Sequence, residues 1–492
     1  MTLKRIALPL CLLALLAGCG DEQQEQLDIS VIGDQLTVKD PAIQPVDPAR
    51  AVMLAATAQG LVRFDAAAQV QPGLASRWAI VDQGRSLIFR LTDGNSEGPR
   101  PDWLSARAIA ERLRRSLVNN PANPLSPQFN AVESIRAVTP QVIEIRLTSA
   151  RPELLTALAQ PEAGLLFGRS LRGTGPLKIV KQTEQGWVLV PVDIDGKSLA
   201  AVDGKTLTSV KIRAEKAPLA VARFARGWTH LVLNGQLQDL PLVAAARIND
   251  RQLQVDPTNG LFGLAIGSKQ TFLQEPAIRR ALAMAIDRPA LLHSFDLARD
   301  MAQESLLPPR LADLPDAPAS TWITMGQDER EAFARAQLAE WTASGHEIPT
   351  LRLALPSGHG SDLLFRHLRT QWARIGVPIE RGNAADADLW LIDMVAPADT
   401  ASWYLRQFMC VPGRICDHFA DGKLIEAKDA ATPEQRIDAL RTAASSYNDT
   451  TPFIPLFRPI RWSLVAPTLD GFTPNGRAIH PIDLIRFGRA RP

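Results

Sequence analysis

The chain is 492 residues long, with 46% hydrophobic and 22% charged residues. These fractions are typical of a folded globular protein and exclude a disordered or membrane-embedded chain, and the length predicts two or more domains because one hydrophobic core rarely grows so large. Basic residues number 54 and acidic residues 52, with no long basic run, so no nucleic-acid partner is expected.

The N-terminus carries an export pattern. Two basic residues precede an apolar run over 6–15 that is too short for a permanent membrane span, and Leu-Ala-Gly leads directly into Cys19. This pattern resembles a bacterial lipoprotein signal, which implies removal of residues 1–18 and acylation of Cys19 as the new N-terminus. The alternative is an ordinary secretory peptide cleaved near Ala17. Both interpretations export the protein, and we expect it to be periplasmic and lipid-anchored to a membrane.

Folded structure is expected only after a short spacer. Residues 19–26 are polar and acidic and predict a tether. A strand is predicted over 27–31 and a helix over 51–61, with the Asp-Pro pair at 47–48 marking the loop between them. Residues 86–91 alternate apolar and polar, which predicts a half-buried strand.

Two later segments have local patterns of their own. A Gly-Thr-Gly-Pro turn is predicted at 173–176 and a helix over 276–288. In the turn, the glycines are expected to supply backbone angles that other residues avoid. In the last helix, apolar residues recur at helical spacing and predict a buried face.

The order of these segments resembles the family 5 solute-binding proteins of ABC importers, the dipeptide and oligopeptide binders. The resemblance is carried by short blocks along nearly the whole mature chain: 40–41, 59–65, 72–78, 87–91, 105–117, 173–176, 210–213, 276–288, 306–309, 372–377, 452–456 and 469–472. The resemblance implies a helix at 105–117 and a strand at 210–213. Each block is mostly apolar, so the blocks together specify a fold and not a ligand. One departure is Arg-Gly-Trp-Thr-His at 226–230, where the family usually has Gly-Glu-Val-Asp.

The resemblance implies an α/β periplasmic binding protein with two lobes, mixed sheets and strands that cross between the lobes. Lobe I would comprise residues 27–51, 165–258 and 462–492, the inserted domain residues 52–164, and lobe II residues 259–461. A solute would be buried between lobes that close by hinge bending. The implied partners are a peptide or other small molecule and the permease subunits of an ABC transporter in the inner membrane. We expect a monomer without a cofactor.

Two cysteines remain in the mature chain besides the proposed anchor. Cys410 and Cys416 form an even pair in an exported protein, which favours a disulfide that closes a short loop. His418 is the one histidine nearby, so a zinc site made of two cysteines and a histidine is the alternative.

No catalytic motif competes with solute binding. The sequence lacks a His-Glu-x-x-His pair, a Walker A sequence and a glycine-rich dinucleotide loop, so we expect no enzyme. Two other functions stay open. One is an accessory or receptor lipoprotein that binds a non-peptide solute (an oligosaccharide, opine or metal chelate) or none, and the less favoured one is an exported hydrolase.

The candidate ligand site is the stretch 386–416, where an alternating strand opens into a loop, as clefts in α/β proteins often do. In peptide-binding members of the family, a Trp and an Asp precede the first cysteine here, and the Asp pairs with the peptide ammonium. Counting back from Cys410 without gaps places Ala396 at the Asp position and Asp393 at the Trp position. The usual anchor for a free amine is therefore absent.

Other residues of this stretch are candidate ligand contacts. Asp399 either replaces the missing carboxylate or caps the helix that follows, and capping is the favoured role. Trp403 and Tyr404 are expected to offer aromatic surface to the ligand, with one of the two facing the core. Arg406 is expected to meet an acidic group of the ligand, and Asp393 is also a candidate contact. No metal ligand is assigned.

Overall fold

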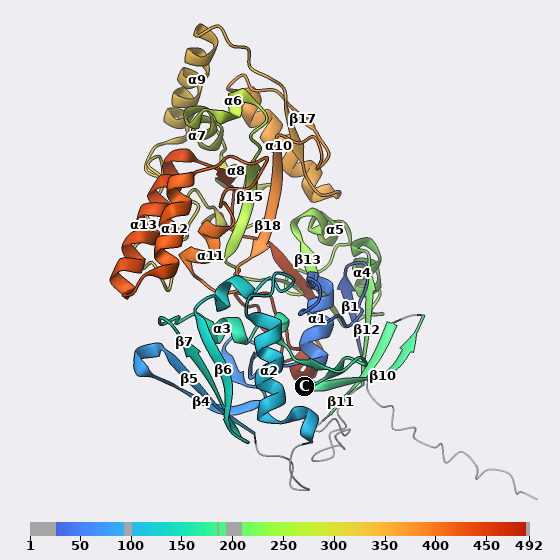
Figure 1. Ribbon diagram of the computed structural model, residues 1–492. Coiled ribbons are helices and arrows are strands. Elements are labelled where there is room, and N and C mark those ends of the chain that lie inside the picture. The colour runs from blue at the N-terminus through green and yellow to red at the C-terminus, as the bar shows by residue number, and fades with distance from the viewer. Residues whose placement is uncertain (1–25, 93–100, 185, 193–208, 489–492) are drawn as a thin grey trace, which may run out of the picture.

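The computed structural model describes residues 26–92, 101–184, 186–192 and 209–488, and Figure 1 shows two lobes, one above the other. The upper lobe is built on a five-stranded sheet, and the lower lobe combines a seven-stranded sheet with a separate four-stranded sheet. The predicted signal segment and Cys19 lie outside the described residues.

The seven-stranded sheet gathers segments from both ends of the chain. Its strands, in spatial order, are β10 (Leu177–Thr183), β11 (Gly186–Pro191), β12 (Ser209–Glu215), β1 (Gln26–Ile32), β13 (Leu231–Gln236), β20 (Arg461–Val465) and β14 (Leu253–Val255). β1 runs parallel to β12 and β13, whereas β20 is antiparallel to both of its neighbours. The sheet is therefore mixed, as expected from the resemblance.

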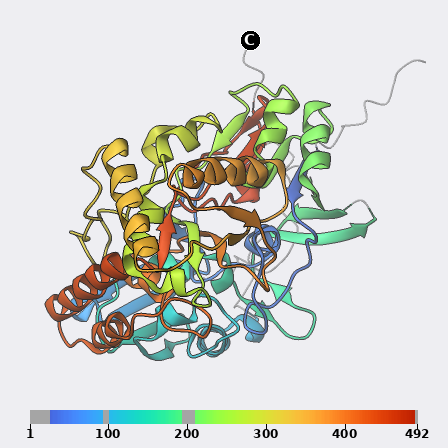
Figure 2. The ribbon, with the colours of Figure 1, turned by 90° about the horizontal axis from the view of Figure 1, so that it is seen from above.

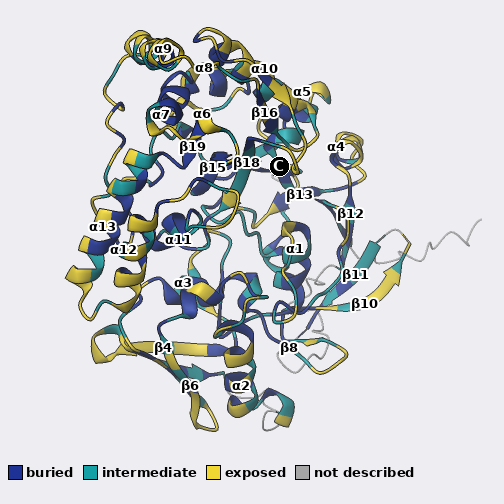
Figure 3. Cartoon of the chain, turned by 45° about the horizontal axis from the view of Figure 1, so that its top comes forward, coloured by how far each residue is buried: buried dark blue, intermediate teal, exposed yellow. Residues whose placement is uncertain are grey.

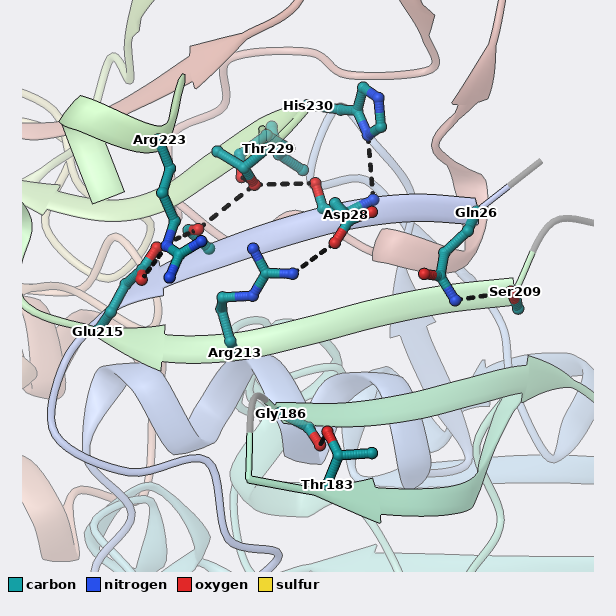
Figure 4. Close-up of polar contacts among 12 residues, drawn as sticks. Gln26, Asp28, Thr183, Gly186, Ser209, Arg213, Glu215, Arg223, Thr229 and His230 are labelled. Atoms are coloured by element: carbon teal, nitrogen blue, oxygen red, sulfur yellow. Dashed lines mark hydrogen bonds and ion pairs between the residues drawn. The ribbon is translucent and has the colours of Figure 1, made fainter. Parts of the chain in front are cut away.

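Polar side chains tie the middle strands of this sheet together (Figure 4). Asp28 on β1 pairs with Arg213 on β12 at 2.5 Å, and its backbone amide donates to His230 Nδ1 at 3.1 Å. Thr229 donates its hydroxyl to the Asp28 carbonyl at 3.0 Å. The Thr-His pair in the segment that departs from the family pattern thus fastens β13 to β1.

The four-stranded sheet forms the core of the segment predicted as the inserted domain. Its strands, in spatial order, are β4 (Ala75–Val81), β5 (Ser86–Leu91), β7 (Val142–Leu147) and β6 (Val132–Thr139). The amphipathic helix α2 (Ala106–Leu117) packs its buried residues on this sheet, and Ser105 caps the helix by accepting from the Ala108 amide. α3 (Leu154–Leu158) belongs to the same core.

The upper lobe surrounds the five-stranded sheet with helices, and Figure 2 shows the two orange-red helices α12 and α13 side by side at one edge. The strands are β17 (Ile379–Arg381), β16 (Leu351–Ala354), β18 (Leu389–Val395), β15 (Gly260–Ile266) and β19 (Phe453–Pro455). The helices are α6 (Thr271–Gln274), α7 (Pro276–Met284), α8 (Arg288–His293), α9 (Gln327–Ala343), α10 (His359–Ala373), α11 (Ala401–Arg406), α12 (His418–Asp429) and α13 (Pro433–Thr450).

The remaining elements are short and mostly peripheral. The helices are α1 (Pro48–Thr57), α4 (Ala217–Ala225) and α5 (Pro241–Ala245). The strand pairs are β2 (Val62–Phe64) with β3 (Val70–Pro72), β8 (Leu166–Phe167) with β9 (Arg172–Gly173) and β21 (Leu469–Asp470) with β22 (Arg486–Phe487). The 3₁₀ turns are Asp82–Gly84, Asp102–Leu104, Ser126–Phe129, Pro161–Ala163, Leu237–Asp239, Arg299–Met301 and Ile482–Leu484. Figure 3 shows buried residues along β13 and β15, and exposed residues along β4 and on the outer faces of α9, α12 and α13.

The chain crosses between the two large sheets by two segments, 256–259 and 456–460. The first joins β14 to β15, and the second joins β19 to β20. They lie side by side, because Thr258 donates its hydroxyl to the Pro459 carbonyl and the Asp256 amide donates to the Arg461 carbonyl at 2.9 Å. This paired crossover positions the site described below.

Three local predictions need correction. The Asp-Pro pair at 47–48 is the start of α1 and not part of a loop, since Asp47 caps the helix by accepting from the Arg50 amide at 3.0 Å. The predicted helix over 276–288 is two helices, α7 and α8, with the non-helical Asp287 between them as the N-cap of α8.

The glycines of the Gly-Thr-Gly-Pro turn serve a different purpose from the predicted one. Neither Gly173 nor Gly175 has a positive φ, but a Cβ on Gly173 would lie 1.9 Å from the Thr57 carbonyl oxygen. A Cβ on Gly175 would lie 2.3 Å from the Thr57 carbonyl carbon. These glycines allow two backbones to approach closely at the end of α1.

Among the described residues, no helix has both the length and the apolar content to cross a membrane.

Candidate functional site

A cavity of about 770 Å³ lies between the two lobes. Its wall combines α1, the turns at 124–128 and 160–162, the end of β18, the start of β20 and the C-terminal segment 477–480. Most of this wall is apolar, with Val52, Leu125, Met394, Trp462 and Ile479 among the lining side chains. The volume falls in the range of pockets that enclose a small organic ligand, roughly 300–1,000 Å³.

Asp393, a predicted ligand contact, lines the cavity but has a partner within the protein. Its carboxylate pairs with the Arg461 guanidinium at 2.7 Å, and both side chains are largely buried. Burial raises the pKa of Asp393, and the neighbouring Arg461 charge opposes that rise. The pair joins β18 of the upper lobe to β20 of the lower sheet, next to the crossover.

A contact between a histidine and an aspartate closes the same side of the cavity. His480 lies 3.1 Å from the buried Asp256 carboxylate, which also accepts from the Asn475 amide at 2.8 Å. The ring of His480 stacks on Phe472, with their centroids 4.4 Å apart. The first crossover is thereby fixed to the C-terminal segment.

Arg477 contacts Ala396, the residue that the gapless count places at the amine-anchor position. Its guanidinium donates to the Ala396 carbonyl at 2.9 Å and pairs with Asp399 at 2.5 Å. Asp399 also accepts from Asn259 at 3.1 Å and is not among the residues that line the cavity. This corner therefore offers a paired guanidinium and not a free carboxylate.

The predicted capping role of Asp399 is wrong. The N-cap of α11 is Thr400, and the first turn is held by Asp313, which accepts from the Ala401 amide at 2.6 Å and from the Ser402 hydroxyl at 2.7 Å. The carboxylate comes from a loop 88 residues earlier in the chain, so local spacing could not reveal it.

The two aromatic candidates on α11 take different places. Trp403 lines the cavity, whereas Tyr404 is fully buried and lies outside the lining. Their rings meet edge to face at 4.9 Å, so the Tyr404 ring supports the Trp403 ring from behind. The expectation that one of the pair faces the core therefore holds for Tyr404.

Arg406, the predicted contact for an acidic group, lines the cavity from the end of α11. It donates to the Pro127 carbonyl at 3.2 Å and forms no ion pair with any described carboxylate. Burial lowers the pKa of its guanidinium, and the nearby Arg436 charge adds to that effect.

Cys410 and Cys416 are joined by a disulfide across a six-residue separation. His418 lies close, with its Nε2 3.5 Å from Cys416 Sγ. Bonded sulfurs are not thiolates, so the zinc alternative would require the reduced form. The disulfide secures the loop that follows α11, and neither cysteine lines the cavity.

The profile of the bacterial extracellular solute-binding proteins, family 5, matches residues 69–394. The chain belongs to this family. A probable di/tripeptide-binding protein 5 of Pseudomonas aeruginosa is 23% identical over 478 residues, covering 84% of this chain and 87% of that protein.

Solved structures of family 5 type share the fold over almost the full length. Haemophilus influenzae OppA in complex with RPPGFSPFR superposes with a TM-score of 0.75 at 15% identity, covering 95% of this chain and 99% of that one. The Escherichia coli murein tripeptide binding protein MppA gives 0.74 at 17% identity, with 94% and 99% covered. The two-lobed periplasmic binding protein fold is thus established for this family 5 chain.

Sequence reasoning missed several cavity residues of this family 5 protein, namely Glu162, Asp256, Arg461, Arg477 and His480. Glu162 lies in a Pro-Glu-Ala turn, and the others lie in crossover or C-terminal segments without motif character. Their position depends on long-range packing, so no spacing in the sequence indicates it.

Proposed function

We propose that this protein is the extracytoplasmic solute-binding component of an ABC transporter that captures a peptide or peptide-like solute between its lobes and presents it to a membrane permease. The observation that supports this most directly is the 770 Å³ cavity enclosed by both lobes of a family 5 fold. The named relative and the two solved structures are peptide-binding proteins by description.

The proposal includes the organisation inferred from the sequence. Lobe I would comprise 27–51, 165–258 and 462–492, the inserted domain 52–164 and lobe II 259–461, and the strands of the three large sheets distribute in line with that division. The protein would be a monomer attached to the membrane through Cys19. Replacing Cys19 with Ala should release it into the soluble periplasmic fraction, and a membrane-bound variant would contradict the anchor.

Thermal unfolding with a panel of di- to tetrapeptides tests the solute class. A solute that binds only the folded protein stabilises it by about 2.7 kcal/mol at one hundred times its Kd. We expect at least one peptide to raise the Tm in a concentration-dependent manner. The same panel should remain uncleaved, because we propose no catalytic activity.

A peptide-like acid without a free amine is the second candidate. One observation favours it: the Arg477 guanidinium donates to the carbonyl of Ala396, the residue at the position where peptide-binding members of the family have a carboxylate. A rise in Tm with an N-acetylated peptide or another acid that lacks an amine, and with no free peptide, would replace the peptide by this class.

A further inference from the structure

Charged residues that line the cavity fall into two groups. Asp393 with Arg461 and Asp256 with His480 are paired across the wall, and Arg477 is paired with Asp399 behind it. Glu162 and Arg406 have no ion-pair partner among the described residues. A solute therefore meets one acidic and one basic side chain that have no internal ion-pair partner.

Glu162 lies in the 3₁₀ turn Pro161–Ala163 of the inserted domain. Asn123 holds this turn in place by donating to the Glu162 backbone carbonyl at 2.9 Å, and the adjacent Gln160 donates to the Pro397 carbonyl at 2.6 Å. Burial raises the pKa of the Glu162 carboxyl and a hydrogen bond from the Glu162 backbone amide opposes that rise, with no charged side chain of the described residues contributing. The turn thus presents an acid at a fixed place in a mostly apolar wall.

Arg406 approaches the cavity from the other lobe, at the end of α11. Its hydrogen bond to the Pro127 carbonyl leaves most of the five guanidinium N–H donors available. Because carboxylates and phosphates match the planar donor fork of arginine, an anionic group is the natural occupant.

We propose that the solute is zwitterionic and spans these two residues, with a cationic amine held by Glu162 and an anionic group held by Arg406. This inference rests on the proposed solute-binding function and adds the anchor residues to it. The amine anchor then comes from the inserted domain instead of the loop at Ala396. A solute that lacks either charge leaves a partly buried protein charge unpaired, and selectivity follows from that cost.

The amine contact is tested by isothermal titration of the best peptide and its N-acetyl derivative against wild type and Glu162→Gln. Loss of one partner of a desolvated pair should weaken binding by about 30-fold or more. We expect acetylation to cost that much in wild type. Glu162→Gln should bind the free peptide with a similarly reduced affinity, and acetylation of the peptide should not reduce the affinity of this variant further.

The anionic contact is tested by the same cycle with the C-terminal amide and Arg406→Gln. Amidation should weaken binding to wild type and leave binding to the variant unchanged. Arg406→Lys keeps the charge and should restore part of the affinity, which a merely structural role would not predict.

Glu111→Gln on the exposed face of α2 and Arg441→Gln on α13 are the matched controls, since both side chains form surface ion pairs away from the cavity. They should bind the free peptide as wild type does. A circular dichroism melt confirms that each variant is folded.

The results separate the two proposals. If peptides bind but acetylation costs the same in wild type and Glu162→Gln, the amine anchor is overturned and peptide binding stands. If only non-peptide zwitterions bind and the cycles behave as described, the peptide assignment fails and the two anchors stand. Binding only of solutes without an amine overturns the inference, and a panel with no binder at all overturns both.

Discussion

The two sides of the cavity treat charge differently. Beside the crossover, Asp393 and Asp256 each have a basic partner within 3.1 Å. Near the inserted domain, Glu162 of that domain and Arg406 of the upper lobe have no oppositely charged partner among the described residues. A buried charge with an internal partner positions the chain, whereas one without a partner is available to a ligand, so the two groups should respond differently to substitution.

The largest loss of stability is expected for Asp393→Ala. Removing one partner leaves the Arg461 guanidinium buried and unpaired, which costs about 3–5 kcal/mol. Chemical denaturation measures this loss. Asp438→Ala on α13 is the matched control, because its pair with Arg441 is well exposed and should contribute about 0–1 kcal/mol. Equal losses in the two variants would show that the Asp393 pair is not structural.

A smaller loss is expected for Asp256→Asn. The amide oxygen can still accept from the Asn475 amide, but the carboxylate bonded to His480 is gone, so the cost should be about 1–2 kcal/mol. Because the pair fastens the crossover and not the solute, peptide affinity should change less than stability. An affinity loss without any change in unfolding free energy would argue instead for direct solute contact.

The smallest effect, and one that depends on pH, is expected for Glu162→Gln in the absence of solute. Burial raises the pKa of Glu162, so the folded protein holds this proton more tightly than the unfolded chain does. The protonated carboxyl therefore contributes its full stabilisation below about pH 4.3, the ordinary Glu pKa. This stabilisation is lost as the pH rises through the higher pKa of Glu162 in the folded protein.

Gln cannot titrate, so the unfolding free energy of Glu162→Gln should increase relative to wild type as the pH rises over this window. Denaturation series between acidic and neutral pH measure the difference. A difference that stays flat with pH would mean that an internal cation already neutralises Glu162, and the contrast between the two sides of the cavity would disappear.

Local patterns and the resemblance to the family together predicted much of the fold. The strand over 86–91 coincides with β5, the helix over 105–117 is α2 with its Ser105 cap, and the two-lobed architecture follows from the order of the family blocks. The errors arose where a long-range contact decides the conformation. Gly173 and Gly175 are required because the backbone at the end of α1 approaches them closely. The residues next to these glycines in the sequence do not indicate that approach.

The site was less accessible from the sequence. Asp393, Trp403 and Arg406 were named because they lie in one stretch with a recognisable strand and loop, and they line the cavity. Their partners come from elsewhere in the chain, as with Arg461, which lies 68 residues from Asp393. Whether a charge is paired or unpaired is a property of such distant neighbours.

The side-by-side crossovers also limit how the molecule can move. Two strands of backbone tied together at Thr258 and Pro459 bend readily about a line through both of them but resist twisting. Rotation about that line displaces atoms in proportion to their distance from it. Arg406 of the upper lobe donates to the Pro127 carbonyl of the inserted domain, so any opening of the lobes at this point has to break that bond.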